Sequence, residues 1–553
     1  MPAHTSAVAL DRITFHWPDG TVALDGVSGT FGAGRTGLIG RNGSGKSTLL
    51  TLISGERSPS AGQLTISGAV DRLPQQLTLD VDRPVADLLG IGDALRAVRA
   101  IEDGDVDPAR FDAVGDDWDV EARATAALAE VGLPDGTLDR RVGSLSGGEA
   151  VLAALVGIRL RGAPIALLDE PTNNLDRDAR RRVYELVRMW RGTLIVVSHD
   201  TELLDLMDDT AELHDGRLTV FGGPYSAWRE QFELEQAAAR QAESAARQVV
   251  RREKRDRVEA ENKLAQRAAM GARAQREKRV PGIVAGNRKS AAQVSAGKLR
   301  TEATEKLSAA RAELDAAGRR VRDDDSVRID LPDPGVGAGR RIATIGDGER
   351  EWIIQGPERV ALIGPNGAGK TTLLERLVAS GGVDAGVRHA RSTVSAEGSL
   401  HPEDSRAALG RVYGHAHTDR IGYLSQRVDG LDDDASVLEN LRSPGVGDVE
   451  LRNRLARFLL RGATVLRPVS ALSGGERFRA ALARLLLADP SPQLLVLDEP
   501  TNNLDLDTID QLVDAISSYR GAVLVVSHDE GFLRRITPAV VLELREGTLT
   551  VNE

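Results

Sequence analysis

The segment Gly40-Arg41-Asn42-Gly43-Ser44-Gly45-Lys46-Ser47 decides the fold of the first half of the chain. It matches the pattern G-x-x-x-x-G-K-S/T, whose glycines let backbone N–H groups surround the phosphates of a nucleotide. Lys46 supplies a point charge to those phosphates, and the Ser47 hydroxyl is suited to Mg²⁺. A strand-like run over 37–40 precedes the loop, and Thr48 begins a predicted helix whose positive end points at the same anion. The segment therefore predicts a nucleotide-binding α/β domain.

Two later apolar runs end in residues that suit phosphate chemistry. Ile165–Leu168 is followed by Asp169 and Glu170, and the run that ends at Val197 is followed closely by His199. Carboxyl ends of parallel strands border the ligand crevice of such a fold. We therefore expect Asp169 to hold Mg²⁺ through water, Glu170 to polarise an attacking water, and His199 to contact the γ-phosphate. Residues 145–149, Leu-Ser-Gly-Gly-Glu, predict a further helix N-terminus facing phosphate.

The whole set recurs in the second half of the chain. A second phosphate loop covers 364–371, a second Leu-Ser-Gly-Gly-Glu covers 472–476, and a second apolar run ends in Asp498 and Glu499. Glu170 and His199 are 29 residues apart, as are Glu499 and His528. Matching motifs in one order at such spacing indicate a tandem duplication.

These motifs resemble the ATP-binding-cassette (ABC) ATPases: Walker A, the LSGGE signature, Walker B with its catalytic glutamate, and the switch histidine. In both copies Pro-Thr-Asn-Asn-Leu-Asp follows that glutamate, at 171–176 and 500–505. The chain resembles the ABC-F family of ribosome-associated translation factors in three features: this repeated hexapeptide, the presence of two cassettes in one chain, and the long basic linker between them. The implied fold is α/β, with two P-loop ABC ATPase domains at 1–228 and 321–553, joined by a basic α-helical hairpin at 229–320.

The resemblance also assigns the residues of two ATP–Mg²⁺ sites. Glu170, Glu499, His199 and His528 are the expected catalytic residues. The expected nucleotide-binding residues of the first copy are Trp17 (stacking on adenine), Gly40, Asn42, Gly43, Ser44, Gly45, Lys46, Ser47, Thr48, Gln75, Ser146, Gly147, Gly148 and Glu149. Those of the second copy are Gly364, Asn366, Gly367, Ala368, Gly369, Lys370, Thr371, Thr372, Gln426, Ser473, Gly474, Gly475 and Glu476. Mg²⁺ is expected on Ser47, Gln75 and Asp169, and on Thr371, Gln426 and Asp498. In the family the two cassettes of a monomer pair head to tail, so the Lys46 site would face Ser473–Glu476, and the Lys370 site would face Ser146–Glu149.

The linker has a lopsided charge. Residues 225–270 contain neither Gly nor Pro and predict a long helix, which Gly271, Pro281, Gly282 and Gly286 are expected to end before a returning helix over about 287–317. From 240 to 300 there are 17 basic and 6 acidic residues, although the chain as a whole carries −11. Such a surface favours a polyphosphate partner, and the resemblance makes that partner rRNA and tRNA on the ribosome. The alternative is a solvated coiled coil whose charges only keep it soluble.

Three features depart from the family pattern. The second copy has no aromatic residue where Trp17 stands in the first, because Trp352 lies too close to Gly364, on a later strand. A polar insert around 380–420 precedes Gln426 and has no assigned role. About 24 extra residues, around 80–139, stand where the family places a ribosome-contacting arm; their acidic composition suits RNA poorly and predicts a short or vestigial arm.

The composition of the chain indicates its cellular location and limits the hypotheses for its function. The 553 residues include no cysteine, no apolar run of transmembrane length and no signal-peptide pattern, which predicts a cytoplasmic protein. The first hypothesis is an ATP-gated factor that acts near the tRNA and the peptidyl-transferase centre and protects the ribosome from antibiotics. Its alternatives are a general ABC-F translation factor, the ATPase of a membrane exporter, and a DNA-associated ABC ATPase. The sequence does not indicate which antibiotic is countered, what the linker tip contacts, or whether both sites hydrolyse ATP equally.

Overall fold

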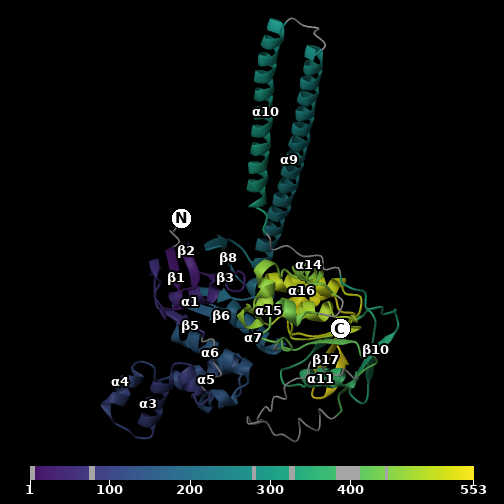
Figure 1. The fold of residues 1–553 in the computed structure, drawn as a ribbon. Helices are drawn as coiled ribbons and strands as arrows, with labels where there is room; N and C mark the ends of the chain where they lie inside the picture. Colours follow the sequence, from purple (N-terminus) through teal and green to yellow (C-terminus); the bar gives the residue numbers. More distant parts are fainter. Residues whose placement is uncertain are drawn as a thin grey trace. The chain divides into compact units, whose positions relative to one another are not determined.

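The computed structural model of the chain describes residues 7–73, 81–276, 282–322, 331–381, 411–426, 428–442, 446–502 and 504–552. It contains two compact units, Met1–Tyr225 together with Ser326–Glu553, and Ser226–Asp325. The first unit holds two similar domains, called here the first cassette (7–222) and the second cassette (331–552). The second unit is the helical hairpin (Figure 1).

The first cassette is built on two sheets. A three-stranded antiparallel sheet has the order β2-β1-β4, and a six-stranded sheet has the order β5-β6-β7-β3-β8-β9, parallel except for its last pair. The strands are β1 (Val8–His16), β2 (Val22–Phe31), β3 (Arg35–Ile39), β4 (Ala61–Ile66), β5 (Val70–Arg72), β6 (Ile165–Asp169), β7 (Thr193–Val197), β8 (Asp209–His214) and β9 (Arg217–Phe221). Strands β6 and β7 are buried at every position, as continuous apolar runs in a parallel sheet require.

Helices cover this sheet and fill the segment between β5 and β6. They are α1 (Lys46–Ile53), α2 (Val85–Leu88), α3 (Gly92–Glu102), α4 (Pro108–Val114), α5 (Val120–Glu130), α6 (Gly147–Arg161), α7 (Arg177–Arg188) and α8 (Thr201–Leu204), with 3-10 turns at Thr137–Asp139 and Val142–Ser144. One apolar cluster joins β1–β3 to α1, and another joins the sheet to α2, α5, α6 and α7. The two faces of one sheet therefore carry separate cores.

The second cassette repeats this topology. Its sheets have the orders β11-β10-β13 and β14-β15-β16-β12-β17-β18. The strands are β10 (Arg341–Gly346), β11 (Glu351–Gln355), β12 (Arg359–Ile363), β13 (Tyr413–Ala416), β14 (Ile421–Leu424), β15 (Leu494–Asp498), β16 (Ala522–Val526), β17 (Val540–Arg545) and β18 (Thr548–Val551). The helices are α11 (Lys370–Ser380), α13 (Val437–Asn440), α14 (Asp448–Ala456), α15 (Gly474–Leu486), α16 (Leu506–Ser518) and α17 (Glu530–Ile536), with 3-10 turns at Gly462–Leu466 and Val469–Ala471.

The extra residues of the first cassette form helices. Helices α3 and α4 pack together with the start of α5 around a small apolar cluster of Ala97, Val98, Val114 and Val120. This cluster is separate from the main core, so the insertion is a small helical subdomain. Most of the polar insert of the second cassette, 382–410, lies outside the described residues.

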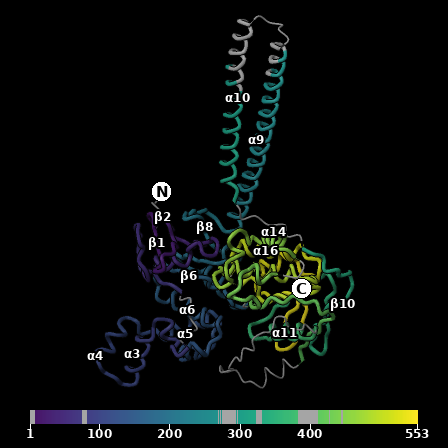
Figure 2. Tube along the Cα trace, viewed as in Figure 1, coloured from purple at the N-terminus to yellow at the C-terminus, as the bar shows by residue number. Residues whose placement is uncertain are grey.

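The hairpin consists of α9 (Tyr225–Arg276) and α10 (Gly282–Gly318), which run antiparallel (Figures 1 and 2). The predicted break at Gly271 is wrong, because α9 continues to Arg276. The break at Gly286 is also wrong, since α10 already begins at Gly282. One glycine costs a helix only about 1 kcal/mol, which the neighbouring turns of so long a helix offset. Pro281 lies outside the described residues.

Candidate functional site

The two phosphate loops have the same local geometry. Lys46 Nζ donates to the carbonyl of Gly40 at 2.5 Å, and Lys370 Nζ donates to that of Gly364 at 2.7 Å. Gly40 has φ 150° and Gly364 has φ 146°, and a Cβ on Gly364 would stand 2.2 Å from the Leu544 carbonyl oxygen. Both positions therefore require glycine, which lets the backbone turn tightly around the lysine.

The carboxylates at the ends of β6 and β15 stand beside the loop hydroxyls. Ser47 Oγ lies 3.3 Å from Asp169 Oδ1, and a side-chain hydrogen bond joins Thr371 to Asp498. The next residues, Glu170 and Glu499, have φ of 50° and 47°, in the left-handed region that is rare for non-glycine residues. Such backbone strain gathers at functional sites. Here it turns each glutamate out of its strand.

Each glutamate meets its histidine across adjacent parallel strands. Glu170 Oε1 is 3.2 Å from His199 Nε2, and Glu499 Oε1 is 3.3 Å from His528 Nε2. In the second cassette Lys370 Nζ lies 3.1 Å from the same Nε2, which can accept its proton only if the imidazole is neutral. The spacing of 29 residues seen in the sequence thus spans one strand-to-strand connection.

Burial governs the ionisation of these groups. Burial raises the pKa of Glu499 to about 7, although the Lys370 charge opposes this, and burial raises the pKa of Glu170 as well. Burial and the neighbouring Lys370 ammonium lower the pKa of His528 to about 3. A glutamate with its pKa near neutrality and a neutral histidine suit proton acceptance and hydrogen bonding to an incoming water.

In the first cassette these residues line one cavity of about 370 Å³. It brings together the predicted site residues Trp17, Asn42, Gly43, Gly45, Lys46, Ser47, Thr48, Asp169, Glu170 and His199, and adds Thr21, Val22, Ala23, Asn173 and Val197. The Arg57 guanidinium lies 4.9 Å from the centre of the Trp17 ring, a contact that the sequence did not predict. The indole, which lines the cavity, therefore carries a cation–π partner.

The structure gives less information on three other sets of predicted residues: the aromatic position of the second cassette, the two glutamines and the serines of the Leu-Ser-Gly-Gly-Glu motifs. Trp352 lies on β11, paired with Ile345, and the turn before it contains no aromatic residue. Gln426 follows β14 and is exposed, whereas Gln75 lies outside the described residues. Ser146 and Ser473 cap α6 and α15, each exchanging hydrogen bonds with the glutamate three residues later. That these serines face the opposite ATP site stays a prediction.

The two cassettes contact each other through the ends of the Pro-Thr-Asn-Asn-Leu-Asp segments. Asp505 Oδ2 accepts a hydrogen bond from the backbone N–H of Asn42 at 2.8 Å. In the reciprocal contact, Asp176 Oδ2 accepts from the backbone N–H of Asn366 at 3.3 Å, and the Asn366 amide donates to the Asn174 carbonyl at 2.9 Å. Each aspartate also caps the helix that follows it. The segment of one cassette thus touches the phosphate loop of the other.

Comparison with known proteins identifies this arrangement. The family model described as "ABC transporter" matches residues 24–173 and 350–502. The chain is 32% identical to the tylosin resistance ATP-binding protein TlrC of Streptomyces fradiae, over 99% of this chain and 98% of TlrC. It is 30% identical to the probable ATP-binding protein YheS of Escherichia coli K12 over 94% of this chain and 76% of YheS, and 29% identical to mouse ATP-binding cassette sub-family F member 3 over 91% and 66%. This chain is an ABC-F ATPase.

Solved structures share the fold of this ABC-F chain at lower identity. The RNase-L inhibitor aligns with a TM-score of 0.53 and 19% identity, over 98% of this chain and 90% of that one. The archaeal ribosome recycling factor aABCE1, solved in complex with the stalk protein aP1, aligns with a TM-score of 0.52 and 19% identity, over 98% and 89%. No helix in the described part of the chain is long and apolar enough to cross a membrane.

ABC ATPases generally use Mg²⁺, and the residues of this ABC-F chain fit that ion. Among the described residues none donates a hydrogen bond to the buried Asp498 Oδ2, and the hydroxyl of Thr371 stands beside the same carboxylate. Oxygen donors and a single carboxylate, completed by phosphate oxygens, are the set that Mg²⁺ prefers at nucleotide sites. Thr371 with Asp498 would hold the ion in the second cassette, and Ser47 with Asp169 in the first.

Sequence reasoning missed several residues of the ABC-F site. Asp176 and Asp505 stood within a repeated segment, and that repetition was the signal that could have singled them out. Asn173 stood in the same repeated segment, whereas Arg57 had no comparable signal, because only the folded chain brings its guanidinium to the Trp17 ring.

Proposed function

We propose that this ABC-F ATPase binds the ribosome and acts through its helical hairpin near the tRNA and the peptidyl-transferase centre, protecting the ribosome from an antibiotic. ATP binding would bring the two cassettes together, and hydrolysis would release them. The distribution of charge along the hairpin carries this proposal. The name of the relative TlrC, a tylosin resistance protein, supports the protective role over that of a general translation factor.

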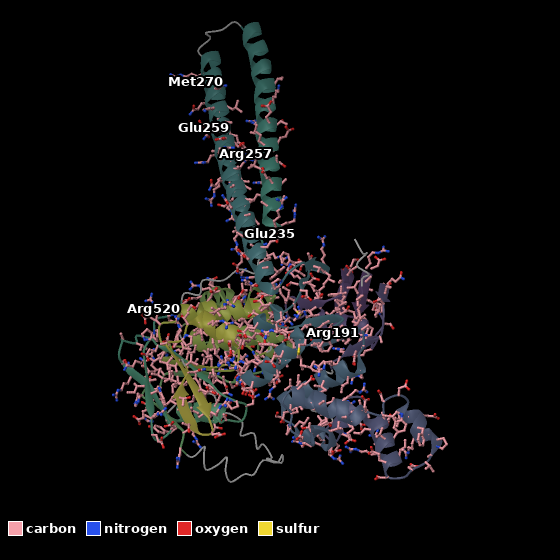
Figure 3. All side chains as sticks on the ribbon, turned by 180° about the vertical axis from the view of Figure 1, so that it is seen from behind. Arg191, Glu235, Arg257, Glu259, Met270 and Arg520 are labelled. Carbon is pink, nitrogen blue, oxygen red and sulfur yellow. The ribbon has the colours of Figure 1, made fainter. Side chains whose placement is uncertain are left out.

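The charges of α9 change in character along the helix. In its first part acidic residues accompany basic ones four residues away: Glu243 lies 2.6 Å from Arg247, and Glu259 lies 2.6 Å from Lys263. From 262 to 300 there are ten basic residues and only one acidic residue, Glu277. Figure 3 shows side chains extending from α9 around Arg257, Glu259 and Met270. Basic residues thus increasingly outnumber acidic ones toward the tip, which suits a phosphate-rich surface.

Contacts between basic side chains and the phosphate backbone of a nucleic acid fit this hairpin better than stacking of bases on aromatic side chains. Residues 240–300 contain no aromatic side chain, so the stacking platforms typical of single-strand binders are missing from the sequence there. Lysine and arginine contacts to the phosphate backbone do not need them. The expected target is therefore structured RNA recognised by shape and charge.

In the catalytic step we assign one role to each conserved position of the two copies. Glu170 and Glu499 would accept the proton of the water that attacks the γ-phosphate, and His199 and His528 would hydrogen-bond to the γ-phosphate as neutral imidazoles. The loop lysines would stabilise the charge on the transferring phosphoryl group. Mg²⁺, when bound, supplies further charge stabilisation to the phosphates.

Reversal of the charge at the tip tests the role of the hairpin. The triple variant Arg276→Glu, Lys278→Glu and Arg279→Glu changes the charge by six, and its matched control is Arg191→Glu, Arg341→Glu and Arg520→Glu on the exposed surface of the cassettes. The tip variant should keep ATPase activity without ribosomes but lose ribosome association. Its residual binding should depend less steeply on salt, because each lost phosphate contact lowers the slope.

Drug protection is measured with the same variants. Expression of the parent in a sensitive host should raise resistance within a panel of ribosome-targeting drugs, and the tip variant should not. If the tip variant binds ribosomes and protects as well as the parent, the hairpin is only a solvated coiled coil. Ribosome binding by the parent without resistance to any drug would favour the general translation factor.

A further inference from the structure

The two nucleotide sites differ at the residue beside the Walker B aspartate. In the first cassette Arg72 Nη2 lies 3.4 Å from Asp169 Oδ2, and its Nη1 lies 3.0 Å from Glu56. The pair with Asp169 is well shielded from solvent, since the arginine side chain is 10% exposed and the aspartate side chain 1%. A permanent cation thus contacts the carboxylate that we expect to hold Mg²⁺.

The second cassette has Tyr423 at the equivalent position. Arg72 stands opposite Leu167 in the pairing of β5 with β6, and Tyr423 stands opposite Val496 in that of β14 with β15. Each partner is two residues before its Walker B aspartate. The Asp498 charge is close enough to Tyr423 to raise the pKa of that phenol, after the larger effect of burial.

The hydrogen bonds of Asp169 and Asp498 differ in the same way as their neighbours Arg72 and Tyr423. Both oxygens of Asp169 have a partner, Ser47 Oγ at 3.3 Å and the Arg72 guanidinium at 3.4 Å. Asp498 Oδ2 receives no hydrogen bond from any described residue. A phenol carries no charge at neutral pH, so the second site relies on an added cation where the first already has a guanidinium.

We propose that Arg72 is a positioning residue that holds Asp169 and makes the first nucleotide site less dependent on divalent cations than the second. The fixed positive charge of Arg72 offsets part of the negative charge of Asp169, so a divalent ion at the first site is attracted less strongly. The first site then keeps more of its affinity for ATP when the ion is removed. This inference rests on the two ATP sites assigned above.

The test compares ATP affinity with and without Mg²⁺ at single sites of the full chain. Lys370→Ala leaves the first site and Lys46→Ala leaves the second, and a fluorescent methylanthraniloyl-ATP reports binding. The measured quantity is the ratio of Kd in EDTA to Kd in Mg²⁺. We expect this ratio to be about tenfold or more smaller at the first site, the effect of one charge-assisted contact.

Reciprocal substitutions decide whether Arg72 is the cause. Arg72→Tyr should raise the ratio of the first site toward that of the second, Tyr423→Arg should lower the ratio of the second, and Arg72→Lys should keep the parental ratio because it keeps the charge. Electron paramagnetic resonance with Mn²⁺ gives a second readout, in which Arg72→Tyr binds Mn²⁺ more tightly at the first site. Thermal melting shows whether each variant folds, and Tyr423→Arg keeps the test open if Arg72→Tyr does not fold.

The outcomes separate this inference from the proposed sites. If neither lysine substitution removes a bound nucleotide, the site assignment itself fails. If each removes one nucleotide but the two sites have equal ratios, only the role of Arg72 is refuted. Arg72→Tyr that weakens binding equally with and without Mg²⁺ would show a structural ion pair and nothing more.

Discussion

Asp505→Asn should weaken the pairing of the two cassettes without unfolding either. Asp505 is 6% exposed, and its Oδ2 accepts from the backbone N–H of Asn42 at 2.8 Å. Its Oδ1 accepts from the Thr508 N–H and caps α16. Burial opposes ionisation, but the hydrogen bonds from Asn42 and Thr508 hold the pKa of this carboxyl below its usual value. Asparagine caps helices as well as aspartate does, so only the contact with Asn42 is lost.

The magnitude follows from the geometry. A hydrogen bond to a charged acceptor contributes about 1.5–3 kcal/mol, which corresponds to roughly 10- to 150-fold in the equilibrium between paired and separated cassettes. The reciprocal variant Asp176→Asn is the matched control. Its bond to the Asn366 N–H is longer, 3.3 Å, and Asp176 is half-buried. We expect less than about 1 kcal/mol there, roughly fivefold or less.

Fluorescence energy transfer between the cassettes measures this equilibrium. The chain has no cysteine, so cysteines placed at Val106 and Val449, 81% and 76% exposed, can be labelled without background. The ATP concentration for half-maximal transfer should rise at least about tenfold in Asp505→Asn, while the melting temperature stays close to that of the parent. A half-maximal concentration within twofold of the parent, or an equal shift in Asp176→Asn, would refute the reasoning.

Three further predictions concern the sites themselves. Glu170→Gln with Glu499→Gln should leave ATP binding intact and lower turnover by about a hundredfold or more, since the proton acceptor is lost; parental turnover would contradict the assignment. Burial lowers the pKa of His528 to about 3, so its contribution to stability is present above pH 6.5 and lost as the pH falls toward 3. Its imidazole should stay neutral between pH 7.5 and 5, as the ¹⁵N shifts of the two ring nitrogens report in NMR, and the ¹⁵N shifts of an imidazolium appearing with a midpoint near 6.5 would contradict this; titration of the nearby Glu499, whose pKa is about 7, moves these shifts by a smaller amount. Trp17→Ala should weaken nucleotide binding at the Lys46 site by about fivefold, from about 1 kcal/mol of stacking, and equal loss at the Lys370 site would count against it.

The sequence by itself determined the elements whose signals are local. The phosphate loops were predictable because glycine spacing and a lysine fix their backbone, and strands β6, β7 and β15 were predictable because both faces of a parallel sheet are apolar. Equal spacing of the motifs was sufficient to predict the duplication. Local signals failed at Gly271 and Gly286, where helix on both sides outweighs the weak propensity of one glycine.

Only the tertiary structure decided which distant residues meet. Asp505 and Asn42 are 463 residues apart, and Arg72 and Asp169 are 97 apart. Neither contact follows from the properties of its own segment, because each depends on the order of strands in a sheet or on how two domains pack. The same aspartate serves as an ordinary helix cap and as a contact between cassettes, and the same arginine could have ended a strand in solvent. Packing against the partner surface, absent from any local pattern, gave these side chains their roles.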